Sequence, residues 1–396
     1  MSEQVPAQWS NFYLKDVSFV NLMMRRIYNV LIVANPYDAF MLEDDGRVEE
    51  KIYNEYMELG LRYPPTFTQV STIEEASKVL NTVDIDLVIC MPGNADNDAF
   101  DVARAVKAEF PDIHCVVLTP FSHGITKRIQ NEDLSIFDYV FCWLGNTNLI
   151  LSIIKLMEDK MNIENDIHEV GVQMILLVED SIRFYSSILP NLYSYILTQS
   201  QNFATEALTR HEASLRQRGR PKVVLARTYE EAWEIYQRYK DNCLGVISDV
   251  RFPINNVEDK GSSATEGNIP VAEKDPEAGL KLLRAIRKED EYLPLIIESS
   301  ESENREKAEA EGFCFVDKNS KKMSVDLRRL LEEHMGFGDF IFRNPKTHEE
   351  VMRVRNLKEL QDNIFKIPRD SMLYHISRNH MSRWLSARAI FPVSSF

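Results

Sequence analysis

Short apolar runs alternate with amphipathic segments along most of the chain, and this alternation predicts parallel sheets covered by helices. The clearer series begins at Met174–Val178 (MILLV), which has no polar position, as expected for a strand buried on both faces. Further strands are predicted at Lys222–Leu225, Leu244–Ile247, Leu295–Ile297 and Cys314–Val316. Helices are predicted in a long region after the first strand and then at Tyr229–Tyr239, Pro276–Lys288, Glu303–Glu311 and Met323–His334.

The first half of the chain repeats this pattern. Strands are predicted at Val30–Val33, Thr66–Val70, Leu87–Ile89, Cys115–Leu118 and Tyr139–Phe141, and a last helix at Asn148–Asp159. We therefore expect an α/β fold with two flavodoxin-like, doubly wound, five-stranded parallel sheets in tandem, followed by a helical C-terminal segment. The predicted parts are an N-terminal segment (1–26), a first domain (27–162), a join near Asn162–Val170, a second domain (171–337) and the C-terminal segment (338–396).

Three segments depart from the alternation. Residues 254–274 are rich in Asn, Gly, Ser and Glu, a composition that predicts a flexible insertion. Phe184–Thr205 is uncharged and long enough to cross a membrane, but its Ser, Asn, Gln and Pro residues favour a helix buried against the first domain or a second chain. In the C-terminal segment, Thr347–Glu350 fits a capping box, and Pro368 with Asp370 marks another helix start.

Composition narrows the class of protein. The hydrophobic content of 44% suits a folded protein, and the net charge of −15 argues against general nucleic-acid binding. The five cysteines form no CxxC pair, which is typical of reduced core residues in a cytoplasmic protein. The first residues lack the pattern of a signal peptide, and we expect no membrane association.

Polar side chains follow the predicted strands of the second series. Glu179 and Asp180 follow the first strand, Asp249 the third, Ser299 the fourth and Lys318 the fifth. The carboxyl ends of parallel strands meet at one edge of a sheet, so these groups should face one cleft. Three close carboxylates repel one another, and Mg²⁺ would relieve that repulsion with oxygen ligands.

In these motifs the sequence resembles the receiver domain of two-component response regulators. The acid pair lies in LLVEDS, the phosphoacceptor Asp249 in SDVRFP, the switch hydroxyl Ser299 in PLIIESS and the lysine Lys318 in FVDKN. The resemblance implies phosphorylation of Asp249, with Mg²⁺ held by Glu179, Asp180, Asp249 and the backbone carbonyl of Arg251. It also implies that Ser299 and Lys318 bind the phosphate, that Phe315 is the aromatic switch residue, and that Gly279 is the small residue opening the third helix.

Several positions depart from the family pattern. Asn319 replaces the usual proline after the lysine, Glu179 is longer than the commoner aspartate, and the 254–274 insertion lies beside the acceptor. The first domain departs further, because Ala34-Asn35 align with the acid pair, Met91 with Asp249 and Cys142 with Lys318, whereas Thr119 keeps the hydroxyl. We expect a degenerate pseudo-receiver that packs or binds but is not phosphorylated.

The C-terminal segment carries ten Lys/Arg and six Asp/Glu, a charge of +4. It resembles the connector that precedes the ATP-grasp part of receiver-fused phosphoenolpyruvate synthase/pyruvate phosphate dikinase-like proteins. This implies a regulatory part without the catalytic histidine domain of such an enzyme. His375 and His380 have no third ligand in sight and are expected on a helix surface or in the core, and Met381, Trp384 and Leu385 on an apolar helix face.

The function expected from these observations is two-component-type signalling: phosphoryl transfer to Asp249 switches a protein–protein interface. Beyond self-catalysed phosphorylation and dephosphorylation, no enzymatic activity is implied. The expected partners are a histidine kinase or small phosphodonor and an output protein or enzyme domain, such as a phosphoenolpyruvate synthase-like one, with a homodimer as a further option. Two alternatives stay open: a transcriptional response regulator whose basic tail binds DNA, and a scaffold that is not phosphorylated.

Overall fold

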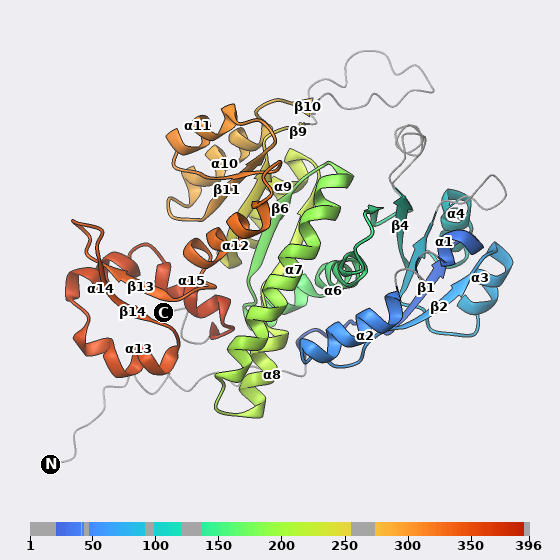
Figure 1. The fold of residues 1–396 in the computed structure, drawn as a ribbon, viewed down its shortest axis with the longest axis horizontal. Coiled ribbons are helices and arrows are strands. Elements are labelled where there is room, and N and C mark those ends of the chain that lie inside the picture. Colours follow the sequence, from blue (N-terminus) through green and yellow to red (C-terminus); the bar gives the residue numbers. More distant parts are fainter. Residues whose placement is uncertain are drawn as a thin grey trace.

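The computed structural model describes residues 21–40, 42, 47–91, 99–120, 136–254 and 274–391. Two five-stranded, all-parallel sheets flanked by helices dominate the described chain (Figure 1). Their strand orders, β2-β1-β3-β4-β5 and β12-β11-β8-β6-β7, are the same when each sheet's five strands are numbered along the chain. The order 2-1-3-4-5 is that of the flavodoxin-like fold, which confirms the predicted fold class.

The first unit contains the sheet formed by β1 to β5, which comes first in the sequence. Its strands are β1 (Asn29–Val33), β2 (Thr66–Val70), β3 (Leu87–Cys90), β4 (His114–Pro120) and β5 (Tyr139–Trp143). Its helices are α1 (Pro36–Phe40), α2 (Val48–Glu58), α3 (Ile73–Leu80), α4 (Ala99–Glu109) and α6 (Asn148–Val170). All five predicted strands are present. Four of them are buried and nearly uninterrupted apolar runs, as expected for a parallel sheet covered on both faces, whereas the edge strand β2 is only partly buried.

The second unit has the same arrangement. Its strands are β6 (Met174–Val178), β7 (Lys222–Ala226), β8 (Cys243–Asp249), β11 (Leu295–Ser299) and β12 (Cys314–Asp317). Its helices are α7 (Ile182–Thr205), α8 (Arg210–Arg218), α9 (Tyr229–Tyr239), α10 (Ala278–Glu289), α11 (Glu303–Ala310) and α12 (Met323–His334). Residues 255–273, the greater part of the predicted flexible insertion, lie outside the described residues, and β9 (Phe252–Pro253) pairs with β10 (Lys274–Asp275) on either side of them.

The two units are joined by a helix instead of a linker. Helix α6 continues eleven residues beyond the predicted end at Asp159 and stops at Val170, where Gly171 adopts a left-handed conformation (φ 84°). The segment predicted as the join, Asn162–Val170, therefore belongs to this helix. Its inner side is buried and charged: Glu158, Asp159 and Asp166 have at most 2% of their surface exposed.

Helix α7, which contains the uncharged segment Phe184–Thr205, packs against the first unit. The Tyr185 hydroxyl donates to the Val140 carbonyl, and the Ser186 hydroxyl accepts from the backbone N–H of Cys142 (2.9 Å). Val140 and Cys142 both lie on β5, the edge strand of the first sheet. Hence α7 covers an edge that would otherwise present unpaired backbone groups.

The C-terminal region is mostly helical, but it begins with a β-hairpin. Strands β13 (Phe340–Arg343) and β14 (Glu350–Val354) pair antiparallel, and α13 (Leu357–Asn363), α14 (Arg369–Ile376) and α15 (His380–Ala387) follow. The capping box predicted at Thr347–Glu350 is wrong, because these residues form the turn of the hairpin and the start of β14. The helix start at Pro368 is confirmed.

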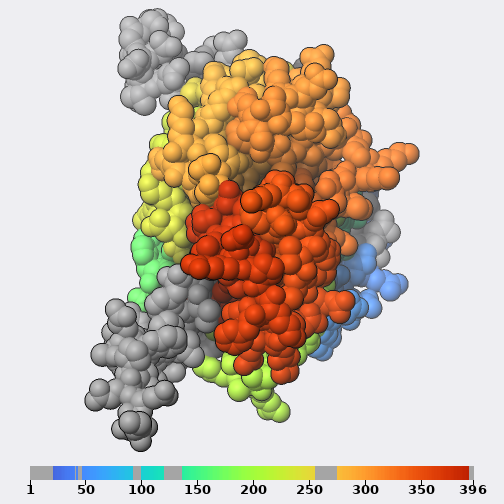
Figure 2. All heavy atoms as spheres, turned by 90° about the vertical axis from the view of Figure 1, so that its left-hand side faces the viewer, coloured from blue at the N-terminus to red at the C-terminus, as the bar shows by residue number. Residues whose placement is uncertain are grey.

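Figure 2 shows this C-terminal region lying directly against the second unit. The Arg388 guanidinium donates to the Gly336 carbonyl of the second unit (2.6 Å), and Arg383 approaches Asp290 of the same unit at 3.6 Å. No described helix is long and apolar enough to cross a membrane. All five cysteines are free thiols, as predicted.

Candidate functional site

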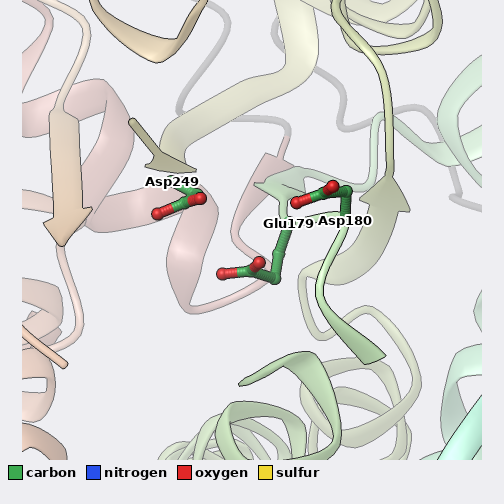
Figure 3. Close-up of side chains that lie close together, drawn as sticks. All are labelled: Glu179, Asp180 and Asp249. Atoms are coloured by element: carbon green, nitrogen blue, oxygen red, sulfur yellow. The ribbon is translucent and has the colours of Figure 1, made fainter. Parts of the chain in front are cut away.

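The topology brings the predicted acids together. Strands β6 and β8 are neighbours in the second sheet, and Asp249 ends β8 while Glu179 and Asp180 follow β6. One carboxylate oxygen from each of the three residues lies within 4.8 Å of the others. Figure 3 shows the three side chains converging on one space at this edge of the sheet. Among the described residues, this is the group of acidic side chains that could hold a metal ion.

Two lysines balance the acids. The Lys318 ammonium donates to Glu179 Oε2 and to Asp249 Oδ1, the latter at 2.6 Å. Lys274 pairs with Asp180 Oδ2 at 2.5 Å. Lys274 comes from β10, directly after the undescribed part of the insertion, so the insertion delivers a cation to the acid cluster.

Burial sets the electrostatics of the site. Glu179 is fully buried, and this burial raises its pKa; the nearby Asp249 carboxylate acts in the same direction, and Lys318 opposes both. Burial also raises the pKa of Asp180. For Lys318, burial favours the neutral amine, but Glu179 and Asp249 outweigh it, so its pKa is raised and the ammonium is retained.

The donor set fits a hard divalent cation. The remaining oxygens of Glu179 and Asp249 accept backbone N–H groups, from Ser181 at 2.9 Å and from Arg251 at 3.3 Å. By contrast, Asp180 Oδ1 is buried and has no hydrogen-bond partner in the described part of the chain. A bound cation would satisfy this carboxylate oxygen.

The predicted switch residues lie on β11 and β12 of the same sheet. The Ser299 hydroxyl is buried at the end of β11 and accepts from the Glu301 N–H (3.1 Å) and the Asn304 amide (2.9 Å). Phe315 is 8% exposed, with the Arg305 guanidinium 4.6 Å from its ring centre. A phosphate contact of Ser299, a switch by Phe315 and a metal contact of the Arg251 carbonyl stay predictions.

Gly279 holds the acceptor strand close to α10. Its N–H donates to the Val250 carbonyl (3.0 Å), and a Cβ at this position would clash with the backbone oxygen of Asp249. Only glycine allows this approach of helix to strand.

Two site residues escaped the sequence-based predictions. Glu298 is 1% exposed, both of its carboxylate oxygens lack a partner among the described residues, and burial raises its pKa to about 7. A charged residue inside the apolar run PLIIESS was a visible signal for it. Lys274 gave no such signal, because its position depends on how the insertion returns to the sheet.

The same strand positions in the first unit lack this chemistry. The pairing of β3 with β1 and β4 places Met91 at the position of Asp249 and Ala34-Asn35 at that of the acid pair, as predicted. One assignment needs correction: Thr119 pairs with Cys142 as Ser299 pairs with Asp317, so Trp143, not Cys142, corresponds to Lys318. Asn35 instead caps α1, accepting from the N–H of Asp38 at 2.9 Å.

Comparison with known proteins gives no identification. No protein-family model matches this chain, and no curated protein matches it.

Proposed function

We propose that the second unit is a phosphoacceptor domain of the two-component type, in which Asp249 receives the phosphoryl group. The observation that carries this proposal is the convergence of Glu179, Asp180 and Asp249 within 4.8 Å, with Lys318 joined to both Glu179 and Asp249. Neither a fold alone nor any one acid would support a function. An acid cluster with a buried lysine at the carboxyl edge of the central strands supports this one.

The reaction needs only groups that the site and a phosphodonor contain. An Asp249 carboxylate oxygen attacks phosphorus and forms an acyl phosphate. The bond from phosphorus to the donor breaks, and its electrons leave with acetate from acetyl phosphate or with the imidazole of a phosphohistidine. Asp249 retains 15% exposure of its side chain, so a donor can reach it.

Each neighbour would have a defined part. Mg²⁺, held by Glu179, Asp180 and Asp249, would neutralise charge on the phosphoryl oxygens. Lys318 would keep its contact with the acceptor and pair with the added phosphate. The Ser299 hydroxyl, which accepts from Glu301 and Asn304, would donate its own hydrogen to a phosphoryl oxygen.

The added phosphate would bring about −1.5 to −2 charges into the cluster. Reorientation of Ser299 and Phe315 would then alter the surface formed by α11 and β12. The proposed donor is a histidine kinase or a small phosphodonor. The proposed target of the signal is an output protein or enzyme domain near the C-terminal region. The sequence of that region resembles the connector of phosphoenolpyruvate synthase-like proteins.

Intact mass after incubation with acetyl phosphate and Mg²⁺ tests the proposal. We expect one phosphoryl group on the wild-type chain and none on Asp249→Asn. Asp241→Asn, an exposed aspartate in the same unit, is the matched control and should be labelled like wild type. Loss of the label in hydroxylamine would identify an acyl phosphate. An unchanged mass together with no Mg²⁺ binding would refute the proposal.

The scaffold alternative has one observation in its favour. Lys318 and Lys274 already pair with all three carboxylates, so the site is largely neutralised without metal. A scaffold would bind its partners equally well as wild type and as Asp249→Asn, with or without acetyl phosphate. A phosphorylation switch requires that this binding differ.

A further inference from the structure

A polar pocket, lined by none of the acid-cluster residues, lies where the first unit meets the second. It is formed by the N-terminal segment, the loop between α2 and β2, helix α6, and helices α7 and α8. Its volume is about 50 Å³, enough for a small anionic group. The lining includes Arg26, Arg62, Tyr63, Lys155, Glu158, Gln217, Arg218 and Arg220.

Three arginines of this pocket have no acidic partner. Arg26 and Arg218 are half-buried and Arg62 is exposed, and none of them forms an ion pair within the described parts of the chain. The one hydrogen bond of these three side chains within the described structure is long: Arg26 Nε donates to the Met23 carbonyl at 3.5 Å. Burial and the positive neighbours Arg26 and Arg62 lower the pKa of Arg218.

The deeper cations of the pocket are already neutralised. Lys155 pairs with Glu158 at 2.7 Å, and Arg220 forms a bidentate pair with Asp159 at 2.8 and 2.9 Å. The acids paired with Lys155 and Arg220 are therefore not available to neutralise the three outer arginines. In a chain with a net charge of −15, carboxylates are abundant, yet the one carboxylate among the lining residues, Glu158, is already paired with Lys155.

Two tyrosines flank the arginines. Tyr63 lines the pocket with 61% of its surface exposed, and its ring lies 6.2 Å from that of Tyr28, which is 45% exposed. Tyr63 also adopts a left-handed backbone conformation (φ 61°), which is costly for a residue other than glycine. The loop that carries Tyr63 lies against α8, since a Cβ added to Gly60 would lie 3.2 Å from the side-chain nitrogen of Gln217.

From this arrangement we propose that the pocket binds a phosphate-bearing small molecule. Arg26, Arg62 and Arg218 hold the phosphate through charge-assisted hydrogen bonds, as guanidinium groups commonly do. Tyr63 and Tyr28 contact whatever the phosphate carries, and a nucleobase is the planar group that such rings suit. The site joins the first unit to α8 of the second, so the ligand would link the two units independently of Asp249.

Calorimetric titration of the full chain in metal-free buffer tests this site separately from the acid cluster. Pyrophosphate and ATP are the probes, and we expect saturable binding that weakens with salt. Arg62→Gln and Arg218→Gln should each raise the Kd by at least about tenfold, the loss expected for one guanidinium–phosphate contact. Arg355→Gln, whose side chain is 72% exposed on the C-terminal region, is the charge-matched control and should bind like wild type.

The outcomes separate cleanly. Because Arg62 is exposed, its substitution should leave the fold intact even if Arg218→Gln destabilises it. If ATP binds more tightly than pyrophosphate and Tyr63→Ala removes the difference, the ligand is a nucleotide; equal binding of both identifies an inorganic phosphate site. No binding of either probe at millimolar concentration, or equal binding by wild type and Arg62→Gln, would overturn the proposal. None of these results affects phosphorylation at Asp249.

Discussion

The ion pair between Lys274 and Asp180 predicts that the insertion restrains metal binding at the acid cluster. A cation must contact Asp180 to complete the three-carboxylate site, and Lys274 lies 2.5 Å from one of its oxygens. Lys274→Met keeps the length of the side chain and removes its charge. We expect this variant to bind Mg²⁺ more tightly than the wild type.

The size of the effect depends on the exposure of the pair. The Lys274 side chain is 45% exposed and that of Asp180 is 12% exposed, so the pair itself contributes roughly 0.2–1 kcal/mol. Repulsion between an ammonium and a divalent ion roughly 5 Å away adds on the order of 1 kcal/mol in a water-like dielectric. A total of about 1–2 kcal/mol corresponds to roughly 5–30-fold tighter binding.

Isothermal titration with Mg²⁺ measures this difference directly. Lys281→Met is the matched control, because Lys281 also forms a half-exposed pair with an aspartate, Asp275, but outside the cluster. Asp180→Asn should bind Mg²⁺ weakly whether or not Lys274 is present. If Lys274→Met binds Mg²⁺ no better than wild type, or if Lys281→Met gains as much, the restraint does not exist.

Three further tests address the rest of the fold. Gly279→Ala should lower the free energy of unfolding by roughly 1–3 kcal/mol in urea denaturation, since its Cβ clashes with the backbone oxygen of Asp249; unchanged stability would show that the contact is easily relieved. Burial lowers the pKa values of His375 and His380 to about 4, so the unfolded chain takes up protons first as the pH falls from about 6.5 to 4. Glu179 and Glu298 act in the opposite sense over this range, so the wild type is compared with a His375→Gln/His380→Gln variant in which their contributions are unchanged. Relative to that variant, the urea midpoint of the wild type should fall through the window and level off below it, and a flat difference would contradict the assignment. Arg220→Met leaves a buried carboxylate without its bidentate partner and should cost about 3–5 kcal/mol of stability by the same assay, whereas a loss under about 1 kcal/mol would refute a structural role for the pair.

The strands and the acid cluster followed from the sequence because both depend on short-range rules. A parallel strand with helices on both faces must be apolar throughout, and a five-residue run such as MILLV between polar segments is too short for a buried helix. Strand order then fixes which loop ends meet, so Glu179, Asp180 and Asp249 could be placed together without coordinates. Gly279 belongs to the same class, because one close approach of the backbone requires it.

The hairpin shows how one local pattern can conceal another. Thr347 and Glu350 have the spacing of a capping box, but in the two flanking strands the more buried positions recur at every second residue. Phe340, Phe342 and Val354 are each at most 6% exposed. The inner face of the two strands packs in the cluster that contains Trp384, whereas the consecutive apolar residues of FIF and VM give no period-two pattern in the sequence.

Lys274 and Trp143 were beyond sequence reasoning for another reason. The position of Lys274 depends on the path of an insertion whose composition specifies no structure. The position of Trp143 depends on strand register, and one residue of slip moves a side chain to the opposite face of the sheet. Apolar runs locate strands to within a residue or two, which is too coarse to fix register.

Helix α6 links the two units through buried ion pairs, which a domain boundary drawn at residue 162 or 171 would overlook. Its Asp159 accepts hydrogen bonds from Tyr193, Arg220 and the N–H of Val223, and its Asp166 lies 2.9 Å from Lys222. These acids belong to the last helix of the first unit, and their partners lie on α7 and at the start of β7 in the second. Apolar residues of equal volume would bury as much surface, but only paired charges penalise every alternative placement of one sheet on the other. The charged face of α6 therefore specifies how the two units fit together, and a second unit cut off at residue 171 would lose the carboxylates that its buried Arg220 and Lys222 require.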